Sequence, residues 1–178
     1  MLVNGVQLFA RDHSRLLGSL PGSFSSNDDA THNLNLRLSA LDHGLVHTRA
    51  QWLLVSVGDR ACDAECERHL YLQRQLREGL GKEKGRLDWV WLRTGSTPLT
   101  PALLAATEQA TVLQVDEAAL AQWLQPAPGQ RLSDHLYVVD PLGNWMMRFP
   151  APLDPKKAKS DLDRLLRASA FWDKAGRP

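Results

Sequence analysis

The residues of this sequence best suited to chemistry are Cys62 and Cys66, its sole cysteines. They follow an apolar run and lie four positions apart. Residues at this spacing project from one face of a helix, so the two sulfur atoms are expected to lie close together. At a helix N-terminus, unpaired N–H groups and the helix dipole favour the thiolate over the thiol. Two such thiolates can form a disulfide or hold a soft metal ion.

The composition of the 178-residue chain is typical of a soluble globular protein, with 43% hydrophobic and 23% charged residues. A chain of this length suits a single domain with its own core. Lysine and arginine total 21 against 20 for aspartate and glutamate, so the charge balance gives no reason to expect nucleic acid as a partner. A disulfide that closes so short a loop removes little entropy from the unfolded chain, so the cysteine pair is expected to be chemical rather than stabilising.

The cysteines lie where a predicted strand gives way to a predicted helix. The apolar, β-branched run from Trp52 to Val57 is typical of a buried strand, and Gly58 and Asp59 end it. A helix is predicted over residues 63–80. Its apolar face consists of Cys66, Leu70, Leu76 and Leu80.

The elements on either side of this unit predict an α/β fold. Further strands are predicted at 87–92, 111–115, 136–139 and 145–149, and helices at 100–110, from 116 to before Pro126, and from 154. Residues 140–143 predict a type I turn that joins the last two strands into a β-hairpin. A right-handed βαβ unit followed by a hairpin and a closing helix gives a central mixed sheet with helices on both faces, which is the layout of a thioredoxin-like fold. Residues 1–33 are expected to be an extended lead-in, and 34–178 the domain, beginning with a half-exposed strand at 34–41.

Two stretches of the sequence resemble a known family. The first runs from Cys62 to Cys66 after the buried strand, and the second runs from Asp134 to Gly143 and continues to Pro150. Together they resemble the Sco/SenC copper chaperones. They are more closely similar to small bacterial thioredoxin-like proteins associated with cytochrome c oxidase assembly. The resemblance extends over roughly residues 50–170, and these two stretches are its specific part.

This resemblance implies a copper site and a cellular location. Sco proteins hold copper through both cysteines of a CxxxC motif and one histidine, so the implied ligands are Cys62, Cys66 and His135. The metal could be Cu(I) or Cu(II), because thiolates select the first and imidazole suits the second. The implied partner is cytochrome c oxidase subunit II or another assembly factor. The implied location is the periplasmic side of the cytoplasmic membrane, with a native N-terminal anchor lying before residue 1.

Three alternatives stay open at this point. The domain could be a thiol–disulfide oxidoreductase that reduces the cysteines of a partner's copper site, with Cys62 attacking and Cys66 resolving. It could also be a scaffold that uses neither thiol. His69, three residues after Cys66, could replace His135 as a third ligand, although packing against the sheet is the more common role of such a histidine.

Overall fold

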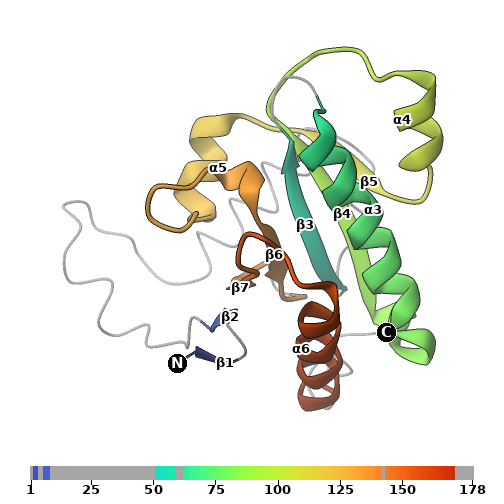
Figure 1. The fold of residues 1–178 in the computed structure, drawn as a ribbon, viewed down its shortest axis with the longest axis vertical. Coiled ribbons are helices and arrows are strands. Elements are labelled where there is room, and N and C mark those ends of the chain that lie inside the picture. The colour runs from blue at the N-terminus through green and yellow to red at the C-terminus, as the bar shows by residue number, and fades with distance from the viewer. Residues whose placement is uncertain (1, 4–5, 9–50, 59–61, 142, 171–178) are drawn as a thin grey trace.

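A seven-stranded mixed sheet forms the centre of the protein in the computed structural model, which describes residues 2–3, 6–8, 51–58, 62–141 and 143–170 (Figure 1). Within this part of the chain the strand order is β1-β2-β7-β6-β3-β4-β5. The strands are β1 (Leu2–Val3), β2 (Val6–Leu8), β3 (Trp52–Gly58), β4 (Leu87–Arg93), β5 (Thr111–Gln114), β6 (Leu136–Val139) and β7 (Trp145–Arg148).

The predicted βαβ unit and hairpin are both present. Strand β3 pairs in parallel with β4, and β4 with β5, while β6 runs antiparallel to both β3 and β7. The α-helices are α3 (Ala64–Gly79), α4 (Pro101–Ala106), α5 (Glu117–Trp123) and α6 (Pro155–Ala168). The thioredoxin-like fold predicted from the sequence is therefore confirmed.

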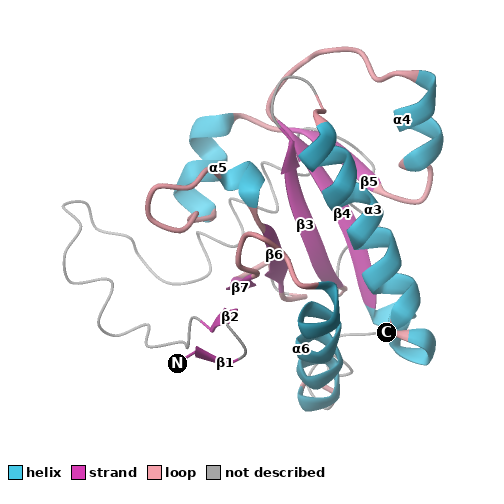
Figure 2. Cartoon of the chain, viewed as in Figure 1, coloured by secondary structure: helices cyan, strands magenta, loops and turns pink. Residues whose placement is uncertain are grey.

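The alternation of side chains along the strands builds a core on each face of the sheet. Leu54 and its partner Trp89 belong to the cluster that packs under α3 and α6, whereas Val55 and its partner Val90 belong to the cluster that includes Leu120 of α5. Helices therefore cover both faces, as the sequence predicts, and Figure 2 shows the strands between them.

Local signals explain where most helices begin and end. Asp63, Thr100, Asp116 and Asp154 each accept a backbone N–H at the start of a helix, and proline follows at the first position of α4 and α6. Helix α4 ends at Ala106, earlier than predicted, and the Thr107 hydroxyl donates to the Leu103 carbonyl at 2.7 Å at this end.

Short 3₁₀ helices and a tight turn form three of the connections. A 3₁₀ helix, η2 (Gly81–Arg86), joins α3 to β4. A second short 3₁₀ helix, η3 (Leu132–Asp134), precedes β6. In the hairpin turn, the Gly143 N–H donates to the Asp140 carbonyl at 3.0 Å, and Gly143 has a φ of 88°, which explains the glycine there.

Two short strands are described in the N-terminal segment. Strand β2 pairs antiparallel with β7, so a piece of the segment expected as a lead-in adds to the sheet. The predicted strand at 34–41 and the proposed boundary between residues 33 and 34 lie outside the described residues. None of the helices described for this chain is long and apolar enough to cross a membrane.

Candidate functional site

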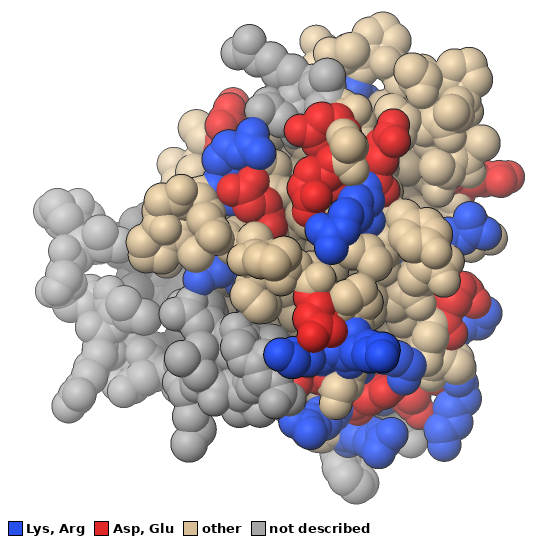
Figure 3. Space-filling view, in the orientation of Figure 1, with Lys and Arg blue, Asp and Glu red and all other residues tan. Residues whose placement is uncertain are grey.

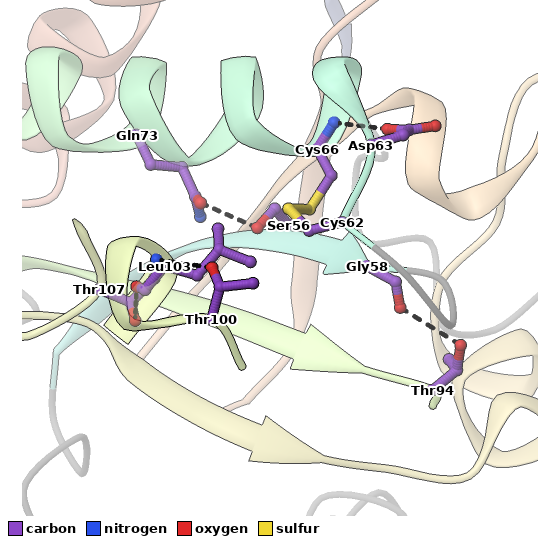
Figure 4. The surroundings of a disulfide bond; sticks show 10 residues. All are labelled: Ser56, Gly58, Cys62, Asp63, Cys66, Gln73, Thr94, Thr100, Leu103 and Thr107. Atoms are coloured by element: carbon purple, nitrogen blue, oxygen red, sulfur yellow. Dashed lines mark hydrogen bonds between the residues drawn. A yellow bond between two sulfur atoms is a disulfide. The ribbon is translucent and has the colours of Figure 1, made fainter. Parts of the chain in front are cut away.

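The two cysteines form a disulfide at the N-terminus of α3 (Figure 4). Their sulfur atoms are 2.07 Å apart and their Cα atoms 5.1 Å apart. Cys62 lies just before the helix, and Cys66 lies in its first turn, where the Asp63 carboxylate accepts the Cys66 N–H at 2.9 Å. Both cysteines are half-buried and pack against the core cluster beneath α3. The sulfurs are thus held together at the end of β3, although Cys62 precedes the helix and does not lie on its face.

A buried polar bridge lies in the surroundings of the disulfide, and the sequence analysis missed it. The Ser56 hydroxyl of β3 donates to the Gln73 side-chain oxygen at 2.8 Å, and both residues are buried. The Gln73 amide donates in turn to the Leu54 carbonyl at 2.7 Å and to the Val90 carbonyl at 3.1 Å. Because these bonds join α3 to β3 and β4, they fix the helix that carries Cys66 over the sheet. Figure 4 shows Ser56 between Gln73 and the disulfide.

The end of β3 is fixed by a further contact before the cysteine loop. The Gly58 carbonyl accepts both the backbone N–H of Thr94, at 3.1 Å, and its hydroxyl, at 3.2 Å. A Cβ atom on Gly58 would lie 2.2 Å from the Trp91 indole nitrogen, so the ring of Trp91 requires glycine at this position. The cysteine loop therefore begins at a closely packed end of strand β3.

The electrostatic surroundings of the cysteines are mainly acidic. Asp63, Glu65 and Glu67 are exposed in and before the first turn of α3, and Figure 3 shows acidic atoms gathered over this region and basic atoms over the region of α6. Arg68 offsets one of these charges through an ion pair with Glu65 at 2.9 Å. Asp59 and Arg60, which the sequence places on the same loop, lie outside the described residues.

His69 is a buried histidine of α3 with one unused ring nitrogen. It is 2% exposed, and its Nε2 lies 3.3 Å from the Glu65 carboxylate. Its Nδ1 has no hydrogen-bond partner in the described part of the protein. Burial lowers the pKa of His69, with Arg68 and His135 acting in the same direction against the carboxylates of Glu65 and Asp134. The imidazole is therefore neutral at physiological pH, and the electrostatic influence of Asp134 and His135 places it toward the segment that precedes β6.

His135 is also buried, but both of its ring nitrogens are occupied. Its Nδ1 lies 2.9 Å from the Phe149 carbonyl, and its Nε2 accepts the Ala127 N–H at 3.2 Å. Because a carbonyl can only accept, Nδ1 carries the hydrogen and the ring is the neutral Nδ1–H tautomer. Burial is the largest cause that lowers the pKa of His135. The ring thus joins the loop at Ala127 to the end of β7.

Of the three ligands that the resemblance to Sco proteins implies, the two cysteine sulfurs suit copper. Two adjacent thiolates, formed on reduction of the disulfide, are ligands that Cu(I) prefers. Within the described residues, no three His, Cys, Asp or Glu side chains are grouped so that they could hold a metal ion. His135 would have to leave both backbone partners to bind a metal, whereas His69 has a nitrogen available. The assignment of Cys62, Cys66 and His135 as ligands stays a prediction.

A groove beside the cysteines offers contact area to a second molecule. It has a volume of about 240 Å³ and lies between α3 and α4. Leu70 and Tyr71 line it from α3, and Leu103 lines it from α4. Leu103 also lies in the surroundings of the disulfide (Figure 4), so the groove and the cysteines belong to the same side of the molecule.

Fold and site together define a thioredoxin-like domain with a cysteine pair at the first strand-to-helix junction of its βαβ unit. A family model described as the transmembrane-like, thioredoxin-like, C-terminal domain matches residues 52–169. The chain belongs to this family. Sequence comparison with curated proteins finds no significant match.

Solved structures with the same fold include copper chaperones and oxidoreductases. Copper-bound Sco1 from yeast has a TM-score of 0.52 at 14% identity, and the match covers 68% of this chain and 82% of that chain. Copper-bound ScoI from Arabidopsis thaliana has a TM-score of 0.51 at 10% identity, covering 69% and 88%. A putative thiol-disulfide oxidoreductase from Bacteroides vulgatus has a TM-score of 0.51 at 16% identity, covering 70% and 79%. The resemblance to Sco/SenC proteins and their thioredoxin-like relatives is thus confirmed at the level of the fold.

Proposed function

We propose that this domain is a thiol–disulfide redox module in which Cys62 and Cys66 cycle between a disulfide and two thiols. The observation that carries the proposal is the bond between the two sulfurs at the N-terminus of α3. Unpaired N–H groups at a helix N-terminus favour a thiolate, which is the attacking species in thiol–disulfide exchange. The groove beside the pair supports an encounter with a partner polypeptide.

In the reductive direction, the thiolate of Cys62 attacks one sulfur of a partner's disulfide. A bond forms between Cys62 and that sulfur, and the other partner sulfur leaves as a thiolate. The thiolate of Cys66 then attacks Cys62 and releases the second partner sulfur, which leaves the module with its own disulfide. Two electrons have passed to the partner, and a dithiol donor must return them to the module.

Exchange with glutathione tests this function. Wild-type protein is expected to equilibrate reversibly between disulfide and dithiol forms in glutathione buffers, as resolved by mass spectrometry after thiol alkylation. Cys66→Ser is expected to accumulate a mixed disulfide at Cys62, because the resolving sulfur is missing, whereas Cys62→Ser is the matched control. A pair that stays fully oxidised or fully reduced across the whole range of buffers would remove the proposal.

A second candidate function is copper binding, and the adjacency of the two sulfurs favours it. We infer that the reduced pair holds Cu(I) through Cys62 and Cys66, with His135 as the predicted third ligand and His69 as its competitor. The copper-bound neighbours from yeast and Arabidopsis thaliana share the fold of this domain, which supports the same use of the site. Cytochrome c oxidase subunit II or another assembly factor would then be the partner, met at the periplasmic side of the membrane by a domain that a native N-terminal helix tethers.

Anaerobic titration of the reduced protein with Cu(I) against a competing chelator tests this candidate. The wild type is expected to retain the metal, and the double variant Cys62→Ala and Cys66→Ala is expected to lose it. Equal affinity in the two proteins would end the copper proposal. Loss of affinity in His135→Phe would identify His135 as the third ligand, and loss in His69→Phe would identify its competitor.

A further inference from the structure

Nδ1 of His69 is a buried nitrogen to which no residue described in the structure donates a hydrogen bond. Nε2 faces the Glu65 carboxylate at 3.3 Å, and a carboxylate only accepts, so Nε2 carries the hydrogen of the neutral ring. Nδ1 is then the nitrogen with the lone pair, and no donor in the described part of the chain reaches it. A buried acceptor left unpaired costs roughly 1–3 kcal/mol, so a state of the protein that supplies a donor would be stabilised.

Reduction of the disulfide creates such a donor on the same helix. In the disulfide neither sulfur carries a hydrogen, but reduction turns each into an S–H group. Cys66 lies three residues before His69 in α3, and residues at this spacing are neighbours on the helix surface. Side chains on a helix also point toward its N-terminus, which directs the ring of His69 toward the turn that contains Cys66.

Three polar hydrogens of this region already have acceptors. The Ser56 hydroxyl already donates to Gln73 at 2.8 Å, and the Cys66 backbone N–H already donates to Asp63 at 2.9 Å. The Nδ1 hydrogen of His135 is directed to the Phe149 carbonyl at 2.9 Å. The new S–H group of Cys66 is therefore the donor that the geometry of α3 offers to His69.

We propose that reduction of the disulfide forms a hydrogen bond from the Cys66 thiol to Nδ1 of His69, and that this bond stabilises the dithiol form. The inference rests on the proposed thiol–disulfide function and extends it. Because this bond exists only in the reduced state, His69 is a positioning residue for the Cys66 thiol and shifts the redox equilibrium toward the dithiol.

The direct test follows the His69 nitrogens by ¹⁵N NMR while the protein is reduced with a phosphine. The Nδ1 signal of His69 is expected to move on reduction, because a free lone pair gains a donor, while the Nδ1 signal of His135 stays in place. Cys62→Ala, which keeps the thiol of Cys66, is expected to show the reduced signal. Cys66→Ala is expected to show the signal of the oxidised protein. A His69 signal that does not respond to reduction would overturn the inference.

A second test measures the thiol–disulfide equilibrium against glutathione in His69→Phe. Loss of a bond made only in the reduced state is expected to shift the equilibrium about five-fold toward the disulfide, which is the effect of an average hydrogen bond. An unchanged equilibrium constant would contradict the inference. Failure of the proposed function can be distinguished from failure of this inference. A cysteine pair that does not exchange with glutathione is still reduced by phosphine. The NMR test then decides by itself whether the hydrogen bond forms.

Discussion

Replacement of His135 by phenylalanine is expected to destabilise the metal-free protein markedly. The substitution keeps an aromatic ring in a buried position but removes both polar contacts of the imidazole, at 2.9 Å to the Phe149 carbonyl and at 3.2 Å to the Ala127 N–H. Each buried backbone group left unpaired costs roughly 1–3 kcal/mol. Ala127 is half-buried, so water can partly replace its lost acceptor, and Phe149 is 1% exposed, so its carbonyl has little access to water. The expected loss is about 2–4 kcal/mol, or a fall in Tm of about 10 °C for a chain of this length.

His69→Phe is the matched control for this experiment. His69 is almost as buried as His135, at 2% against 1% exposure. Among the described residues, its single polar contact is to a carboxylate at the surface, and its other nitrogen is unpaired. Removal of an unpaired buried nitrogen offsets the loss of that contact, so the expected change in stability is within about 1 kcal/mol. Urea unfolding of both variants in the disulfide form, without metal, makes the comparison. Equal losses in the two variants, or a larger loss in His69→Phe, would refute the reasoning that His135 joins two segments.

Four further outcomes are expected from the same structure. Gln73→Leu should cost about 2–4 kcal/mol in urea unfolding, because it leaves the Ser56 hydroxyl without its buried acceptor and removes two bonds to strand carbonyls. Gly58→Ala should cost about 1–3 kcal/mol and change tryptophan fluorescence, because its Cβ would lie 2.2 Å from the Trp91 indole nitrogen. Asp63→Ala should cost about 1 kcal/mol through loss of the N-cap of α3, while Asp63→Asn, which can still accept the same N–H, should cost less. Burial lowers the pKa of both buried histidines, so the unfolded chain binds protons that the folded protein does not. Stability should therefore fall as the pH drops below about 6.5, by at most about 1.4 kcal/mol per pH unit for each histidine, and the paired histidine-to-phenylalanine variants should abolish this dependence in urea unfolding series.

The sequence predicted the strand before the cysteines and the starts of the later helices because their signals are local. The run from Trp52 to Val57 has the buried-strand pattern, and capping residues mark the starts of α4, α5 and α6. The partners of Gln73 could not be predicted in this way. The apolar stripe through Cys66 and Leu70 passes through Gln73 seven residues after Cys66, so helical phase could have placed this amide in the core. Its partners on two strands depend on the tertiary arrangement.

The roles of the two histidines depend even more on tertiary contacts. From the sequence, His135 was interpreted as a ligand because it precedes a strand in a stretch that resembles Sco proteins. Its backbone partners, at Ala127 and Phe149, lie in segments whose approach no local pattern indicates. His69 was predicted to pack against the sheet, and it is buried as expected, but its unused nitrogen emerges only from the full set of neighbours. The chemistry of a buried histidine is therefore set by what the fold places around each nitrogen.

A site that cycles between a disulfide and two thiols must keep its fold in both states, and the structure meets this condition. The disulfide closes a loop with a sequence separation of four, which in the chain-entropy model stabilises the folded state by about 2 kcal/mol. The free energy of unfolding of a folded domain is commonly roughly 5–15 kcal/mol, so most of this stability remains when the disulfide is opened. The Asp63 cap and the bonds of Gln73 to β3 and β4 hold the start and the middle of α3 without help from the sulfurs. In the reduced protein, Cys66 therefore stays on a fixed helix with Cys62 directly before its N-cap, and this adjacency serves either exchange with a partner disulfide or capture of Cu(I).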